Sequence, residues 1–362
     1  MARAGLGPAW TCAFANDFDA KKADSYRANW GAGAFKLADV AALASADLPG
    51  RADLLWASFP CQDLSLAGAG AGLAGRRSGT FWQVERLVRT LAAEGRGPGV
   101  LALENVLGLA TSHQGADFAA LVEALARLGY WVGAVALDAA HFTPQSRPRL
   151  FVVASRTAAP PPFLTAKGFD PAFSSPGLER GLARLSQEAR NRWVFWRLPA
   201  PPLRNRALID LLEPAPKDAP EKPSAERDRW LAAMSPASGR ALAAAIATNG
   251  RRVGAVFRRT RRDADGKKIV RVEARFDGLA GCLRTPAGGS SRQSLLIVEN
   301  GETRLRALSA REAARLMGLS DDYILPKGAT AAHHLLGDGV SAPAVRFLSE
   351  NLMIPLAEAA RR

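Results

Sequence analysis

The chain has 362 residues, of which 48% are hydrophobic and 23% are charged, a balance typical of a soluble globular protein with one large or two medium domains. No apolar run approaches the roughly 18 residues of a membrane span, and the N-terminus has no apolar signal-peptide core. The cysteines lie far apart at positions 12, 61 and 282, which argues against a zinc site and a disulfide framework and indicates a reducing compartment. The net charge of +14 favours nucleic acid as a partner, although an arginine-rich proteome would give the same sum.

Apolar runs alternate with amphipathic segments from residue 11 to residue 154. Apolar runs bounded by polar residues predict strands, and apolar residues at helical spacing predict helices. The expected strands cover residues 11–15, 54–57, 100–103, 131–137 and 150–154, and the expected helices cover residues 20–29, 80–93 and 118–128. Strands that alternate with helices in this way indicate a parallel α/β sheet.

A thiol and an acid follow two of the expected strands. Cys61 comes shortly after the run 54–57, and Glu104 directly follows the run 100–103. The carboxyl edge of an open α/β sheet is where such folds keep their active sites. The alternatives are a small buried core residue for Cys61 and an acid solvated at the sheet edge for Glu104.

Two earlier acids, Asp17 and Asp39, also stand at predicted strand or loop edges. In dinucleotide-binding folds an acid at such a place hydrogen-bonds a ribose hydroxyl. The alternative for each is a helix cap or a solvated loop residue.

The composition changes after residue 156, where prolines interrupt any long element. The window 251–275 holds ten Lys and Arg residues against three acids, a net charge of +7. Such clustering favours contact with phosphates; the alternative is a solvated hairpin that turns at Asp265-Gly266. Further on, the sequence predicts a strand over 295–298, a helix over 309–319 with a capping box of Ser309 and Glu312, and a final helix from residue 343.

Five short motifs stand in order along the chain. They are Phe59-Pro60-Cys61-Gln62, Glu104-Asn105-Val106, Gln145-Ser146-Arg147-Pro148-Arg149, Arg284-Thr285-Pro286 and Gly337-Asp338-Gly339-Val340. Together they resemble the ordered motifs of the DNA (cytosine-5)-methyltransferases. The resemblance implies an α/β fold, an S-adenosylmethionine-dependent methyltransferase (Rossmann-like) sheet with helices on both faces. The catalytic domain would cover residues 1–154 and 281–362, and residues 155–280 would form a smaller, irregular target-recognition domain.

The resemblance also implies the chemistry. Cys61 would add to C6 of cytosine as a thiolate, which makes C5 able to accept a methyl group. Glu104 would hold N3 and the exocyclic amine of the base, and Arg149 together with Arg147 would bind the cytosine O2. The target base would be flipped out of the duplex.

By the same resemblance, the methyl donor is S-adenosylmethionine and no metal is expected. The expected cofactor contacts are Asp17 on the ribose, Phe18 on the adenine ring, Asp39 on the adenine amine, and Val40, Pro60, Phe81 and Asp338 around the pocket. The expected DNA contacts are Gln62, Ser65, Arg258, Arg259, Arg261, Arg262 and Arg284. The expected partner is double-stranded DNA, and a separately acting restriction endonuclease could be a second partner. The protein is expected to be a cytoplasmic monomer of bacterial or phage origin, without membrane contact.

The chain departs from the family pattern at its beginning. The family starts with a strand and a glycine-rich turn, close to Phe-x-Gly-x-Gly-Gly, whereas residues 1–7 match the helix after that turn. Without that central strand, backbone groups of its neighbours stay unpaired, and we expect the cofactor to bind poorly. A start codon assigned too late and a decayed gene are the two explanations, and the intact later motifs favour the first. Asp338 is a smaller departure, since many relatives carry Asn there.

Two other functions stay open. One is an RNA cytosine-5 methyltransferase of the same fold, against which the long basic, proline-interrupted insert argues. The other is a catalytically inactive DNA-binding remnant, which only the missing cofactor turn supports.

Overall fold

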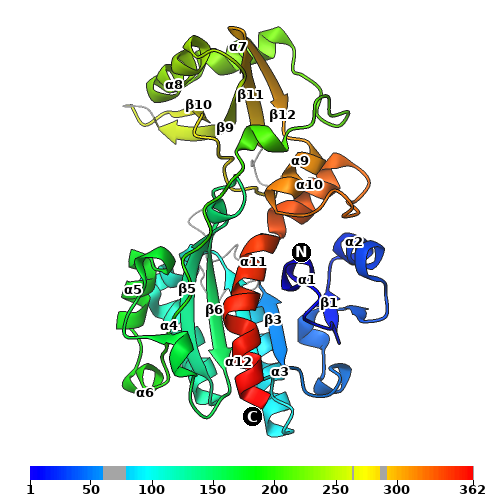
Figure 1. Ribbon diagram of the computed structural model, residues 1–362, viewed down its shortest axis with the longest axis vertical. Helices are drawn as coiled ribbons and strands as arrows, with labels where there is room; N and C mark the ends of the chain where they lie inside the picture. The colour runs from blue at the N-terminus through cyan, green and yellow to red at the C-terminus, as the bar shows by residue number, and fades with distance from the viewer. Residues whose placement is uncertain (60–78, 263–264, 286–291, 362) are drawn as a thin grey trace. The chain divides into compact units, whose positions relative to one another are not determined.

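The computed structural model describes residues 1–59, 79–262, 265–285 and 292–361. The described chain divides into two compact units (Figure 1). The large unit comprises Ala2–Asp138, Pro148–Pro201 and Ala344–Arg362, and the small unit comprises Met1, Ala139–Arg147 and Pro202–Pro343. None of the described helices is long and apolar enough to cross a membrane.

A four-stranded sheet with the order β3-β4-β6-β5 forms the centre of the large unit. Its strands are β3 (Leu54–Ser58), β4 (Val100–Asn105), β5 (Trp131–Asp138) and β6 (Pro148–Ser155). Every residue of β4 is buried, as expected for a strand that is covered on both faces. The four strands predicted for this part of the chain are therefore confirmed.

The predicted parallel arrangement is wrong for part of this sheet. β3 and β4 are parallel, but β6 is antiparallel to both of its neighbours, β4 and β5. The reason is the short connection: only residues 139–147 join β5 to β6, whereas a parallel crossover needs a dozen or more residues, usually with a helix. The sheet is mixed, and the first residues of β6 therefore lie at the same edge as the last residues of β4.

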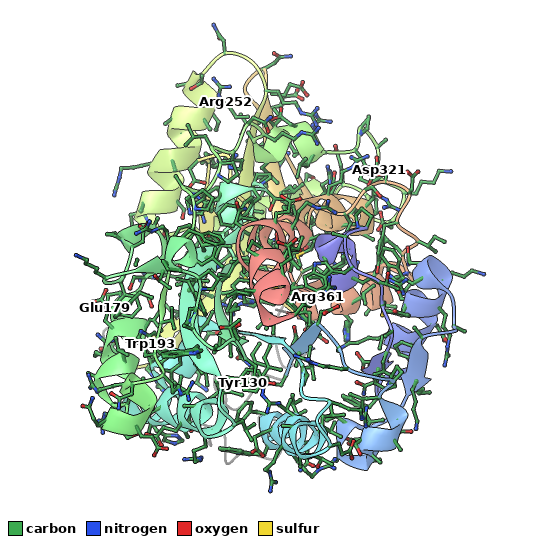
Figure 2. All side chains as sticks on the ribbon, turned by 60° about the horizontal axis from the view of Figure 1, so that its bottom comes forward. Tyr130, Glu179, Trp193, Arg252, Asp321 and Arg361 are labelled. Atoms are coloured by element: carbon green, nitrogen blue, oxygen red, sulfur yellow. The ribbon has the colours of Figure 1, made fainter. Side chains whose placement is uncertain are left out.

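The predicted helices of the large unit are confirmed as α2 (Ala20–Trp30), α3 (Thr80–Ala93) and α4 (Ala116–Arg127). Further helices are α1 (Ala2–Leu6), α5 (Pro176–Ala183) and α6 (Gln187–Arg190). The final helix predicted from residue 343 is confirmed as α11 (Ala342–Leu348) and α12 (Ile354–Arg361), with a π-helical turn between them. Arg361, labelled in Figure 2, pairs with Asp53 at 2.6 Å and ties the last helix to the chain just ahead of β3.

β1 (Ala15–Asp17) and β2 (Phe35–Leu37) form a separate parallel pair. The strand predicted over 11–15 is shifted toward the C-terminus, because β1 is only as long as its partner and begins where Ala15 pairs with Phe35. Within the described residues neither of these strands pairs with β3. Asp17 and Leu37 end the two strands at the same edge.

The small unit contains an antiparallel sheet with the order β10-β9-β11-β12. Its strands are β9 (Arg252–Arg262), β10 (Lys268–Arg275), β11 (Ser294–Glu299) and β12 (Glu302–Ala307). The basic window therefore forms the hairpin β9–β10, and Gly266 in its turn has a left-handed φ of 78°, which glycine adopts without strain.

The helices in the described part of the small unit are α7 (Ser224–Ala232), α8 (Pro236–Ala247), α9 (Ala310–Leu316) and α10 (Ala329–Asp338). Trp230 of α7 and Leu242 of α8 belong to one buried cluster with Val256, Val272 and Leu296 of the sheet. The strand predicted over 295–298 is confirmed as β11, and the predicted capping box begins α9.

The predicted target-recognition segment, residues 155–280, is divided between the two units. Residues 155–201 pack with the large unit, where the short strands β7 (Thr165–Ala166) and β8 (Phe195–Trp196) pair and the Trp196 indole donates to the Val153 carbonyl at 3.1 Å. Residues 202–280 belong to the small unit together with the strands and helices that follow them. The compact units therefore do not end where the predicted segments end.

Candidate active site

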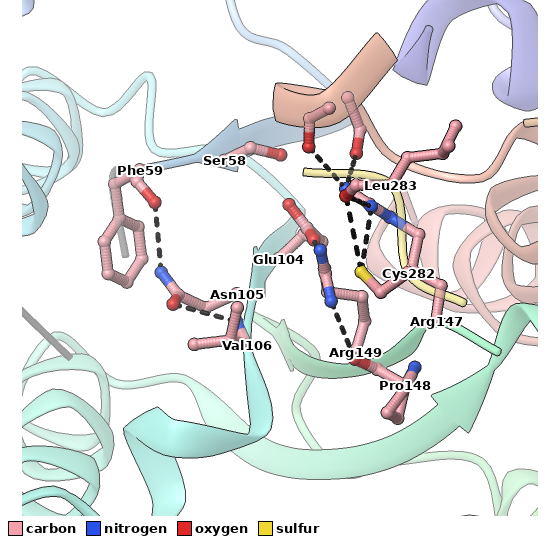
Figure 3. A network of polar contacts seen from close by, with 12 residues as sticks. Ser58, Phe59, Glu104, Asn105, Val106, Arg147, Pro148, Arg149, Cys282 and Leu283 are labelled. Atoms are coloured by element: carbon pink, nitrogen blue, oxygen red, sulfur yellow. Dashed lines mark hydrogen bonds and ion pairs between the residues drawn. The ribbon is translucent and has the colours of Figure 1, made fainter. Parts of the chain in front are cut away.

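Glu104 and Arg149 form an ion pair at the carboxyl edge of β4 (Figure 3). Nε of Arg149 lies 3.1 Å from Oε1 of Glu104, and the side chains are only 13% and 9% exposed. The register explains the pair: Glu104 lies opposite Phe151 on β6, and Arg149, two residues earlier, points to the same face within reach of a long side chain. The antiparallel β6 thus brings together two predicted site residues that are far apart in the sequence.

Asn105, which the sequence analysis did not single out as a site residue, holds the chain that leaves β3. Its Nδ2 donates to the Phe59 carbonyl at 3.1 Å, and its Oδ1 accepts the Val106 N–H at 2.9 Å. A polar residue at the end of a buried strand was the signal for this role, because buried polar groups are hydrogen-bonded. Phe59 is the last residue described before a stretch of predicted site residues that lies outside the described part of the chain: Pro60, Cys61, Gln62 and Ser65.

Arg147 is buried and binds backbone carbonyls of the small unit (Figure 3). One terminal nitrogen donates to the Leu283 carbonyl at 2.8 Å and lies 3.2 Å from the Cys282 thiol, and the other donates to the carbonyls of Gly337 and Gly339 at 2.9 and 2.6 Å. Gly337 and Gly339 stand at the end of α10, where the helix dipole favours a cation. The guanidinium therefore joins the segment around Leu283 to the end of that helix.

The two motif segments joined by Arg147 also touch each other directly. Thr285 Oγ1 donates to the carboxylate of Asp338, so this predicted cofactor residue has a protein partner. A Cβ on Gly337 would lie 2.5 Å from the Thr285 nitrogen, so only glycine fits this approach. Gly337 and Asp338 belong to α10, so the motif 337–340 begins at the end of a helix. Arg284, a predicted DNA contact, is exposed beside this segment.

The predicted cofactor residues of the large unit gather at the ends of β1 and β2. Asp17 ends β1 and accepts the Asp19 N–H, and the Phe18 ring that follows it is 70% exposed. Asp39 follows β2, is exposed, and accepts the Ala41 N–H at the start of a short 3-10 helix that begins with Val40. Because parallel strands end at one edge, two carboxylates and an aromatic ring meet there.

Phe81, also predicted to line the cofactor pocket, is fully buried. Its ring contacts the rings of Phe59 and Trp82, with centroids 5.7 and 4.9 Å away. It therefore supports the chain that leaves β3 through core packing.

The predicted DNA-contacting arginines of β9 differ in their surroundings. Arg259 pairs with Glu273 across the hairpin at 3.1 Å. Arg258 and Arg262 share the other face, because successive residues of a strand alternate, and the register places Arg258 opposite Val272. The side chain of Arg261 lies outside the described part of the structure. Within the described residues no cluster of His, Cys, Asp or Glu could hold a metal ion, and none was expected.

Comparisons with known proteins give one consistent result. A family model described as C-5 cytosine-specific DNA methylase matches residues 1–353. The Type II methyltransferase M.MspI of Moraxella sp is 24% identical over 347 residues, which are 95% of this chain and 66% of that protein. The Type II methyltransferase M.NlaX of Neisseria lactamica is 26% identical over 354 residues, which are 97% of this chain and 91% of that protein.

A solved structure supports the fold. The S. pombe Dnmt2 methyltransferase is similar with a TM-score of 0.55 at 16% identity, over 96% of this chain and 91% of that chain. The chain spans just under two thirds of M.MspI but most of M.NlaX. The family model covers all five motifs, and the resemblance drawn from those motifs is confirmed. The chain belongs to the C-5 cytosine-specific DNA methylase family.

Proposed function

We propose that this protein transfers a methyl group to C5 of cytosine in double-stranded DNA. The observation that carries the proposal is the shielded Glu104–Arg149 pair, at the sheet edge where the chain continues toward Cys61. In this pair the Glu104 carboxyl can accept a hydrogen bond or donate a proton, and the Arg149 guanidinium beside it donates hydrogen bonds. That combination matches the N3, amine and O2 edge of a cytosine.

Cys61 is the proposed nucleophile. Its thiolate forms a bond to C6, and the electron pair of the C5–C6 double bond becomes available at C5. Once C5 carries the methyl group, a base removes the C5 proton, the double bond re-forms, and the sulfur leaves C6. Glu104 assists the first step by protonating N3, because the protonated, cationic ring takes up the electron pair more readily and the adduct is then neutral; Glu104 takes the N3 proton back when the sulfur leaves.

The two arginines of the Gln145–Arg149 motif have different proposed roles. Arg149 is the proposed O2 ligand, and the position of its guanidinium beside Glu104 supports this role. Arg147 is a positioning residue, because its guanidinium binds the carbonyls of Leu283, Gly337 and Gly339. The sequence motif alone assigned both arginines to the base.

Members of this family use S-adenosylmethionine, which when bound supplies an electrophilic methyl group. The residues at the ends of β1 and β2 fit its adenosine part. Asp17 and Asp39 are carboxylates that use one oxygen each on a backbone N–H, which leaves acceptors for ribose hydroxyls and the adenine amine. The exposed Phe18 ring offers a stacking surface. We propose these three residues as the adenosine-binding set of the large unit.

The proposed substrate is duplex DNA with the target base flipped out. The relatives M.MspI and M.NlaX carry the name Type II methyltransferase, which supports DNA over RNA and fits a separately acting restriction endonuclease. Residues 202–280, the part of the predicted target-recognition segment in the small unit, carry the basic hairpin. We propose that this part chooses the target sequence.

Glu104→Gln tests the proposed site without the methyl donor. Addition of Cys61 to C6 lets C5 take a proton from water and release the hydrogen it carried, so tritium placed at C5 should pass into solvent. Glutamine keeps the shape of the side chain but cannot protonate N3, and we expect tritium release from duplex DNA to fall about 100-fold or more. Glu179→Gln, on the exposed surface of α5 and labelled in Figure 2, is the matched control. Equal release by Glu104→Gln and the control would remove Glu104 from the proposed role.

A further inference from the structure

A cleft of about 270 Å³ lies between α7 and the hairpin β9–β10 in the small unit. Its lining residues are Glu226, Arg229, Trp230, Ala233, Arg258, Val270 and Val272. Val272 and Trp230 are 1% and 8% exposed and belong to the core, whereas Val270 is 56% exposed. The cleft therefore has an apolar floor that continues the core and an open apolar edge.

The strand register explains why an arginine stands at this edge. On the inner face of β9, Val256 is fully buried and Arg258 is the next residue on that face. Arg258 lies opposite Val272, and Thr260 lies opposite Val270. Along this face of β9 the buried residues end at Val256, so the Arg258 guanidinium lies at the open edge of the cleft.

The charge of the cleft is positive and held in place. The Arg258 guanidinium carbon lies 5.3 Å from the centre of the Trp230 ring, and Nε of Arg229 donates to the Ala225 carbonyl at 3.2 Å. The carboxylate of Glu226 is bound to Lys222 at 2.5 Å, and this contact is the main cause of its lowered pKa. In the described parts of the chain, no carboxylate forms an ion pair with Arg229 or Arg258. Glu226 also lies near both guanidinium groups, whose charges add to the lowering of its pKa, but its ion pair is with Lys222, so Arg229 and Arg258 can still bind an anion at the cleft.

The outer face of the same hairpin differs. There the Arg259 guanidinium pairs with Glu273 at 3.1 Å and also lies 4.9 Å from the Phe257 ring centre. Its charge is matched within the protein, and a charge that already has a partner gains less from a phosphate. The inner face is therefore the better anion site.

We propose that this cleft binds one nucleotide step of the DNA backbone, with the phosphate on Arg229 and Arg258 and the deoxyribose on Ala233 and Val270. Guanidinium groups bind phosphate oxygens in bidentate geometry, and the apolar edge suits the sugar carbons. The contact positions the duplex and carries no sequence information. This inference rests on the proposed function, because it takes duplex DNA as the substrate.

The test is the salt dependence of binding to a random-sequence duplex. Because Arg229 and Arg258 share one phosphate, the double variant Arg229→Gln/Arg258→Gln should reduce the slope of log K against log salt by about 0.9, the value for one phosphate contact, and each single variant should lose part of that slope. At about 0.1 M salt the double variant should bind about eightfold more weakly. Arg258→Lys should restore most of the slope, since it keeps the charge. Arg271→Gln is the matched control, because Arg271 is exposed on the outer face of the same hairpin, opposite Arg259, and its slope should equal that of the parent protein.

The measurements distinguish a failure of the cleft proposal from a failure of the proposed function. If the parent protein binds the duplex and releases C5 tritium, but the double variant and both single variants keep its slope, the cleft proposal is overturned and the proposed function stands. A slope lost in Arg271→Gln instead would assign the backbone contact to the outer face. If the parent protein neither binds duplex DNA nor exchanges C5 hydrogen, or acts on RNA alone, the proposed function fails first.

Discussion

Replacement of Cys61 by serine is expected to reduce methyl transfer and C5 hydrogen exchange to background, while the Kd for duplex DNA stays within about threefold. A serine hydroxyl at neutral pH is a far weaker nucleophile than a thiolate. Binding, by contrast, derives mainly from phosphate contacts elsewhere on the protein. Transfer of labelled methyl and release of tritium are measured beside DNA binding on the same samples.

Cys12→Ser is the matched control for this change. Cys12 is a partly exposed free thiol that contacts the Phe14 carbonyl and the Tyr26 hydroxyl, and serine has a hydroxyl that can donate and accept at the same place. We expect this control to retain the activity of the parent protein. Exchange that survives in Cys61→Ser would remove Cys61 from the role of nucleophile.

Replacement of Arg147 by leucine is expected to destabilise the small unit by about 2–4 kcal/mol. The carbonyls of Leu283, Gly337 and Gly339 lose their donor. A buried acceptor left without a donor, as at Leu283, costs about 1–3 kcal/mol, and the two partly buried glycine carbonyls cost less because water can reach them. Urea unfolding followed by circular dichroism gives the free energy. Arg147→Lys should recover part of the loss, because an ammonium group reaches fewer of these carbonyls than a guanidinium.

Arg284→Leu serves as the control for Arg147, since Arg284 is exposed next to Leu283. A surface substitution of this kind changes the free energy of unfolding by about 0.5 kcal/mol or less. An Arg147→Leu variant as stable as Arg284→Leu would show that the guanidinium does not hold these segments.

Much of the large unit could be predicted from the sequence, because each strand is an apolar run with its own local signal. The direction of β6 could not be predicted from its composition, since an apolar strand reads the same in both directions. The decisive signal was the short 139–147 connection, which is too brief for a helical crossover. The pairing of Glu104 with Arg149 follows from this reversed strand.

The different partners of Arg147 and Arg149 are a second feature that could not be predicted from the sequence. The two residues have the same side-chain chemistry and stand two positions apart, yet one binds carbonyls and the other a carboxylate. The difference arises because Arg147 precedes β6 and Arg149 lies in it. A motif names both residues but does not say where the strand begins.

The binding residues of the basic hairpin are a third such feature. Alternation predicts that half of the arginines share a face, but both faces carry arginines. The position of α7, which buries Val256 and Val272 against Trp230, shows that Arg258 lies on the face of the hairpin that packs on the core. Arg229 and Trp230 belong to α7, and nothing in the sequence indicated that α7 packs against this hairpin.

The most direct test of the proposed cytosine chemistry is tritium release from duplex DNA labelled at cytosine C5, with no methyl donor present. The exchange requires that Cys61 adds to C6, that C5 takes a proton from water and loses the tritium, and that Cys61 leaves again, so it reports the reacting base and the reacting atom together. We predict release into water that is steady for the parent protein and for Cys12→Ser and absent for Cys61→Ser, with no release from labelled RNA. No release from any duplex, or equal release by Cys61→Ser, would contradict the assignment of this protein as a DNA cytosine-5 methyltransferase acting through Cys61.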